Sequence, residues 1–166
     1  IAIFAKAWGA SRVIVSEINE TRRQFVESMG IETINPANTD AMDLMREVTG
    51  GGGFDIVYDT SGAASCVLQM PDLCRCGGKL MSLNLSGDKY EFILGKISFK
   101  EITLIGNRLY TQEDFELGAK FVEDNWRELG LDRMVTDRLT LSRIHEAIDM
   151  MLTGKNICKI IVDTTK

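Results

Sequence analysis

The sequence contains one histidine, four cysteines and no C-x-x-C pair. Cys66, Cys74, Cys76 and Cys158 lack the spacing of a zinc site, so we expect no metal ligand here and reduced thiols of a cytoplasmic protein. The single histidine, His145, lies between other polar residues on an expected helix, a pattern typical of a solvated surface position. The sequence therefore offers no candidate catalytic residue.

The sequence also lacks a cluster of basic residues and a long apolar run. Its net charge is −5, which argues against nucleic acid or an anionic membrane as partner. No apolar stretch approaches the roughly 20 residues that span a bilayer. The first residues carry no basic leader, so we expect no signal peptide. A hydrophobic content of 45% and a charged content of 26% are typical of a soluble globular protein.

One stretch organises the rest of the chain. Val13, Ile14 and Val15 predict a strand buried on both faces, as in a parallel sheet, and this strand ends at Glu17 before a polar helix start. A carboxylate at the carboxyl end of such a strand can accept hydrogen bonds from both ribose hydroxyls of a dinucleotide and repel a 2′-phosphate. Glu17 therefore favours NAD over NADP, although many strands end in a solvated acid.

Strands and helices are expected to alternate after this point, which predicts an α/β fold with a parallel sheet and right-handed crossovers. The glycines at 50–53 follow a helix rather than a strand, so they indicate a helix stop and turn instead of a phosphate loop. The expected strands are 13–17, 31–36, 54–59, 79–84, 101–106, 135–140 and 159–163, and the expected helices are 1–8, 21–29, 40–48, 63–73, one from 111 and 142–152. Asp40 and Ser142 are expected to cap the helices that they begin.

Several motifs occur in one order along the chain. They are A-K-A-W-G-A-S-R-V-I-V-S-E (5–17), V-T-G-G-G-G-F-D-I-V-Y-D-T-S-G (48–62), C-G-G-K-L-M-S-L (76–83), K-E-I-T-L-I-G-N (100–107), and L-S-R-I-H-E-A-I-D-M-M-L-T-G-K with K-I-I-V-D (141–163). Together they resemble the carboxyl-terminal, cofactor-binding half of medium-chain, zinc-dependent alcohol dehydrogenases, with the polyol and threonine dehydrogenase-like branch nearest. The resemblance implies a doubly wound, Rossmann-type parallel sheet.

The resemblance also implies a set of cofactor-binding residues at the carboxyl ends of the strands. Glu17 matches the ribose-binding acid and Arg22 a basic residue beside the adenine. Asn84 departs from the small or apolar residue expected at its position, and Cys158 replaces a glycine or a pyrophosphate-binding arginine. The remaining residues match turns beside the middle of the cofactor and the nicotinamide: Thr60, Ser61, Gly62, Leu83, Asn84, Leu85, Gly106 and Asn107.

The family's glycine fingerprint and zinc ligands belong to segments that precede the matching region. We therefore expect residues 1–134 to be a partial dinucleotide-binding domain and 135–166 a segment that returns to an amino-terminal catalytic domain. On this interpretation zinc is held only by that other domain, and the 166 residues alone are inactive and bind NAD weakly.

The function that the resemblance implies is hydride transfer between NAD and a secondary alcohol or polyol, in an enzyme that is a homodimer or tetramer through the edge strand 102–106. Two alternatives stay open from the sequence. One is a non-catalytic nucleotide-binding or scaffold domain. The other is a different parallel α/β enzyme, such as a methyltransferase.

Overall fold

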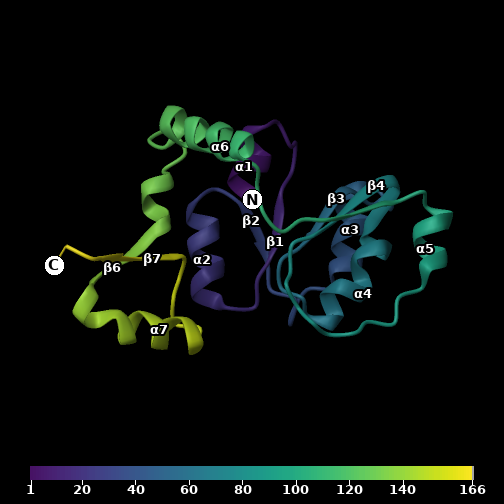
Figure 1. Cartoon of the computed structure of the whole chain (residues 1–166). Helices are drawn as coiled ribbons and strands as arrows, with labels where there is room; N and C mark the ends of the chain where they lie inside the picture. Colours follow the sequence, from purple (N-terminus) through teal and green to yellow (C-terminus); the bar gives the residue numbers. More distant parts are fainter. Residues whose placement is uncertain (166) are drawn as a thin grey trace. The chain divides into compact units, whose positions relative to one another are not determined.

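The structure is a computed structural model that describes residues 1–165 (Figure 1). It divides into two compact units: Ile1–Ala37 with the chain from Thr111 onward, and Asn38–Tyr110. The predicted division at 134/135 rests on the resemblance to the dehydrogenase family and not on contacts within the chain, so it stays a prediction. Lys166 lies outside the described residues. No helix within residues 1–165 is long and apolar enough to cross a lipid bilayer.

The first unit begins with a helix and a parallel pair of strands. Strands β1 and β2 pair in parallel, with Ile14 opposite Glu32, and the side chain of Asn19 caps α2 by accepting the Arg22 N–H. The elements are α1 (Ala2–Ala7), β1 (Ile14–Ser16), α2 (Glu20–Ser28) and β2 (Glu32–Ile34).

The predicted burial of the first strand on both faces is wrong for this chain. β1 is half-buried at Ile14 and Val15 and exposed at Ser16. Among the described residues it pairs only with β2, and a two-stranded sheet is too narrow to enclose side chains on both faces.

The first unit continues with α6 (Gln112–Asn125), which Thr111 and Asp114 cap reciprocally. Phe121 of α6 packs against Phe4 of α1, with ring centroids 4.4 Å apart. The chain then forms a second parallel pair, β6 with β7. The elements are η1 (Leu131–Met134), β6 (Val135–Thr140), η2 (Leu141–Arg143), α7 (Ile144–Leu152) and β7 (Lys159–Asp163).

Ser142 does not cap the last helix as predicted. It lies in the short 3₁₀ turn η2, and α7 starts after Arg143 with no side-chain cap. The hydroxyl oxygens of Ser142 and Thr140 lie 2.8 Å apart. The serine hydroxyl therefore bonds to the preceding strand end rather than to the helix.

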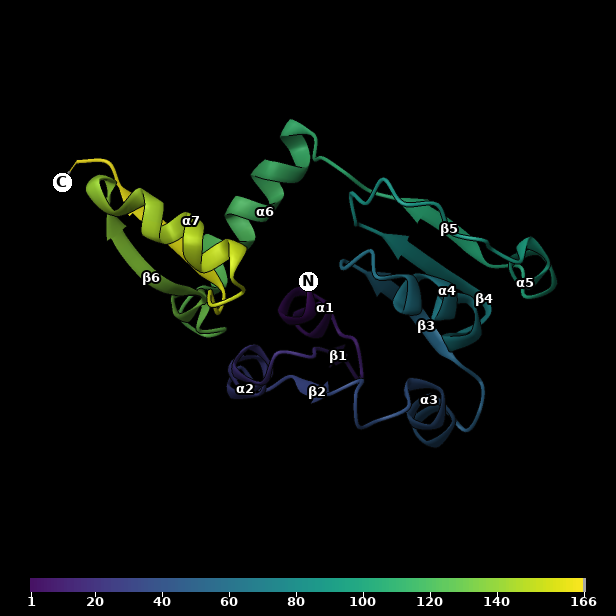
Figure 2. The same cartoon turned by 90° about the horizontal axis from the view of Figure 1, so that it is seen from below.

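The second unit is a three-stranded parallel sheet of order β3-β4-β5, with β4 in the centre (Figure 2). Helix α4 packs on β3 and β4. Asp40 caps α3 as predicted, by accepting the N–H groups of Met42 and Asp43. The elements are α3 (Ala41–Thr49), β3 (Phe54–Asp59), α4 (Ala64–Leu73), β4 (Cys74–Ser82), α5 (Leu94–Phe99) and β5 (Thr103–Gly106).

Strand β4 starts five residues before the predicted 79–84 strand. Cys74 already pairs with Phe54, and the register then shifts so that Ile56 pairs with Lys79. Gly78 lies inside this bulge, where a Cβ would be 2.5 Å from the Cys74 sulfur. Gly77 and Gly78 thus permit a bulge within the strand.

The core of the second unit forms where α4, β4 and β5 meet. Its buried members are Met70, Cys74, Leu80 and Ile102, and Val57, Phe92 and Ile97 pack against them. Burial raises the pKa of the Cys74 thiol, so this cysteine is a neutral core residue. Helix α5, which the sequence did not predict, supplies Ile97 to this cluster.

Lys100, directly after α5, caps the C-terminal end of α4 with its side chain. Its ammonium donates to the backbone oxygens of Pro71, Asp72 and Cys74 at 2.8, 3.2 and 2.8 Å. A helix end leaves its last carbonyl groups without partners, and a cation there also interacts favourably with the helix dipole. Lys100 therefore links the helix end to the segment that leads into β5.

We predict that Lys100→Met lowers the free energy of unfolding by about 1–3 kcal/mol, because three backbone oxygens lose a charged donor. Denaturant titration measures the change. Lys89→Met is the matched control, since Lys89 is exposed in the same unit, and its effect should stay within about 0.5 kcal/mol. Equal effects of the two substitutions would contradict the role of Lys100.

Candidate cofactor-binding site

The predicted site residues are divided between the two units. Glu17 and Arg22 belong to the first unit, and the others, between Thr60 and Asn107, belong to the second. Apart from Arg22, which lies on α2, they are found at the carboxyl ends of parallel strands, where ligands of such sheets bind.

Glu17 follows β1 directly and is half-buried. Its Oε1 atom accepts the Asn19 N–H at 2.7 Å, so the carboxylate is held at the start of α2. Within residues 1–165 its other oxygen, Oε2, makes no hydrogen bond. The contact of this carboxylate with a ribose stays a prediction.

Arg22 is anchored to a distant part of the chain. Its guanidinium donates through Nε to the Asn156 backbone oxygen and through Nη2 to the Asn156 Oδ1 atom, both at 3.0 Å. Asn156 lies between α7 and β7. This two-point contact fixes the plane of the guanidinium, while its place beside an adenine stays a prediction.

The strand ends of the second unit are joined through their backbones. The Leu83 N–H donates to the Asp59 oxygen at 2.9 Å, and the Asn107 N–H donates to the Ser82 oxygen at 3.0 Å. β3, β4 and β5 therefore end at one level, with Asp59 opposite Ser82 and Ser82 opposite Gly106. The sheet brings the predicted turns together at this edge.

Thr60, Ser61 and Gly62 form a tight turn after β3. Gly62 has a φ of +69°, and a Cβ there would lie 3.0 Å from the Ser86 Cβ atom. The position needs glycine both for its backbone conformation and for the close approach of the loop after β4. Thr60 and Ser61 are exposed beside it, and in the loop Leu85 is 77% exposed.

The sequence did not single out Asp59, the residue directly before this turn. Asp59 is 3% exposed, and its carboxylate accepts hydrogen bonds from the turn. The signal was present, because Asp59 is an acid at the carboxyl end of a strand, as Glu17 is. Asp59 also lies within the motif of residues 48–62, but only the three residues after it were predicted to contact the cofactor.

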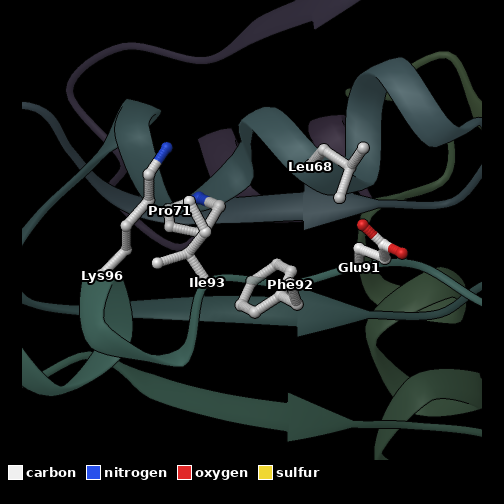
Figure 3. Close-up of a pocket in the computed structure, with 6 residues that line it drawn as sticks. All are labelled: Leu68, Pro71, Glu91, Phe92, Ile93 and Lys96. Atoms are coloured by element: carbon white, nitrogen blue, oxygen red, sulfur yellow. The ribbon is translucent and has the colours of Figure 1, made fainter.

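None of the predicted cofactor residues lines either of two surface pockets. One, of about 210 Å³, lies between Leu68 and Pro71 of α4 and the segment that leads into α5 (Figure 3). The other, of about 300 Å³, lies on β6 and β7 of the first unit.

Within residues 1–165, no group of three or more histidine, cysteine, aspartate or glutamate side chains is arranged to hold a metal ion. His145 is exposed on α7.

A family model described as zinc-binding dehydrogenase matches residues 1–124, three quarters of the chain. The chain belongs to the zinc-binding dehydrogenase family. It corresponds to the carboxyl-terminal half of medium-chain enzymes of this kind, and the predicted family is thereby confirmed.

Two curated dehydrogenases resemble most of the chain. L-threonine 3-dehydrogenase from Sinorhizobium medicae is 29% identical over 163 residues, which are 98% of this chain and 46% of that protein. 2-dehydro-3-deoxy-L-galactonate 5-dehydrogenase from Pseudoalteromonas atlantica is 30% identical over 122 residues, 74% of this chain and 36% of that protein. The chain thus spans less than half the length of these curated relatives.

A solved structure supports the fold. 2R,3R-butanediol dehydrogenase from Bacillus subtilis has a TM-score of 0.85 at 24% identity, over 98% of this chain and 46% of that one. The predicted α/β fold with a Rossmann-type parallel sheet is confirmed.

We predict that Gly62→Ala destabilises the protein by about 1–2 kcal/mol for the left-handed backbone alone, with a further loss from the crowded Cβ. The matched control is Gly87→Ala, at a site with no heavy atom within 4 Å of the added Cβ. Thermal unfolding of the two variants is the measurement. A melting temperature for Gly62→Ala equal to that of the control would show that the turn tolerates a side chain.

Proposed function

We propose that this chain is the cofactor-holding part of an NAD-dependent dehydrogenase that acts on a secondary alcohol or polyol. The observation that carries the proposal is the carboxylate of Glu17, oriented at the carboxyl end of a parallel strand in a member of the zinc-binding dehydrogenase family. When bound, the nicotinamide supplies the hydride chemistry. The residues of this chain bind and orient it.

Within this proposal each cofactor residue has a defined task. The Glu17 Oε2 atom accepts the ribose hydroxyls, and Arg22 lines the adenine side. The turn at Thr60, Ser61 and Gly62 lies under the middle of the cofactor. Leu83, Asn84 and Leu85, with Asn107, line the nicotinamide through their backbone.

The names of the relatives support the proposed substrate class. L-threonine 3-dehydrogenase and 2R,3R-butanediol dehydrogenase are named for substrates that carry a hydroxyl group on a secondary carbon. Family membership favours a dehydrogenase over the methyltransferase alternative. The family implies a zinc ion, but residues 1–165 contain no group of three or more histidine, cysteine, aspartate or glutamate side chains that could hold it. We therefore assign no zinc contact to these residues.

The proposed assembly and location rest on separate observations. β5 pairs only with β4 among the described residues, so it is an edge strand as predicted, and Leu104 on it is 55% exposed. An exposed apolar edge can pair with a second copy of itself.

A cytoplasmic location is proposed because the four cysteines are unpaired.

We predict that Glu17→Ser in the full-length gene product lowers the preference for NAD over NADP by about tenfold or more, because the negative charge that faces a 2′-phosphate is removed. The ratio of kcat/KM values with the two cofactors is the measurement. Glu47→Ser, which removes an exposed charge from α3, should leave the ratio unchanged. An unchanged ratio in Glu17→Ser would refute the assignment, and NAD binding without turnover of any alcohol would favour the non-catalytic alternative.

We predict that Thr103→Lys and Leu104→Asp each dissociate a dimer formed through β5, because a two-fold axis brings each new charge close to its own copy. Light scattering gives the mass, and circular dichroism shows whether the fold is intact. Thr103→Val is the matched neutral control and should remain a dimer. A folded dimer in both charged variants would place the interface elsewhere.

A further inference from the structure

The carboxylate of Asp59 is almost completely buried. Its Oδ1 atom accepts the Ser61 N–H at 3.1 Å, the Ser61 hydroxyl at 2.9 Å and the Gly62 N–H at 3.2 Å. Its Oδ2 atom accepts from the same Gly62 N–H at 3.2 Å and from the side-chain amide of Asn84. No basic side chain pairs with it within residues 1–165, so these donors alone compensate the buried charge.

The donors come from two segments that are separate in the sequence. Ser61 and Gly62 form the turn after β3, whereas Asn84 lies in the loop after β4. The orientation of the Asn84 amide is fixed at both ends, because its Oδ1 atom accepts the Ser86 N–H at 3.2 Å while its Nδ2 atom donates to Asp59. The Asp59–Asn84 hydrogen bond therefore joins the turn to the loop.

Two further contacts tighten this connection. The Tyr90 hydroxyl donates to the Gly62 backbone oxygen, so the chain beyond the loop returns to the turn. The absent Cβ of Gly62 would lie 3.3 Å from the Asn84 Cβ and Cγ atoms. The turn and the loop thus pack in direct contact around one buried carboxylate.

We infer that Asp59 and Asn84 are positioning residues of the cofactor site, which act by locking the turn of residues 60–62 to the loop of residues 83–85. This inference rests on the proposed function, since both segments are the ones assigned to the cofactor. The side chain of Asn84 points into the protein toward Asp59. Its polar character, which departs from the family pattern, is explained by this partner and not by a contact with the nicotinamide.

The chemistry of the pair allows a reciprocal test. In Asp59→Asn two amide N–H donors face each other, and in Asn84→Asp two buried carboxylates face each other. Either single substitution therefore removes the hydrogen bond between positions 59 and 84. The double variant Asp59→Asn/Asn84→Asp restores the pair with its direction reversed. In it, the amide oxygen introduced at position 59 can accept from Ser61 and Gly62 while the amide nitrogen beside it donates to the carboxylate introduced at position 84. That carboxylate can still accept the Ser86 N–H.

The experiment measures the dissociation constant of NADH by fluorescence, and KM for NAD and for the alcohol, in the full-length gene product. Each single variant should weaken NADH binding and raise KM for NAD about tenfold, with KM for the alcohol little changed, because the loss of one charged hydrogen bond is of this size. The double variant should recover to within about threefold of the wild type. Asp55→Asn, on the same strand but exposed and paired with Arg75, is the control and should bind as the wild type does.

Three outcomes would overturn the inference, and they can be told apart. Single variants that melt earlier but bind NADH as tightly as the wild type would show a merely structural role. Weakened binding that the double variant does not rescue would show that the Asp59–Asn84 bond is not responsible. A wild type that binds no NADH would refute the proposed function, and this inference with it.

Discussion

The buried carboxylate of Asp59 is the constraint on which the candidate site depends. A charge out of contact with water is costly unless donors surround it, and here the donors are a turn and a loop from different parts of the chain. The carboxyl ends of β3 and β4 are consequently held in one arrangement before any ligand arrives. If these segments bind the cofactor as proposed, such preorganisation lowers the entropic cost of binding.

In the first unit, strand β1 pairs only with β2 among the described residues, and a two-stranded sheet has little stability by itself. Polar contacts between distant residues supply part of the missing support. The Lys6 ammonium donates to the Gly30 oxygen at 2.7 Å, and the Arg12 guanidinium pairs with Glu32 at 2.8 Å. Arg22 connects α2 to the loop after α7. Of these contacts, that of Arg22 anchors α2 itself, and the Asn19 N–H at the N-cap of this helix binds the Glu17 carboxylate.

The proposed function divides its tasks in the same way. In the proposal, Glu17 of the first unit is the acid at the ribose, and the turns of the second unit are assigned to the middle of the cofactor and the nicotinamide. In each unit the relevant groups follow parallel strands, because the carboxyl ends of such strands leave backbone donors and short side chains open to a ligand. In the proposal, this chain binds and orients the cofactor.

Local features were determined by the sequence itself. The caps at Asn19, Asp40 and Thr111, the glycine stop at 50–53 and most strands follow from side-chain chemistry within a few residues, as does the position of Glu17 after its strand. The tertiary structure decided whatever depends on pairing across long separations: the early start of β4 against β3, helix α5, and the contacts of Asp59 with Asn84 and Arg22 with Asn156. These last partners are 25 and 134 residues apart, so only the packed sheet and its crossovers could bring them together.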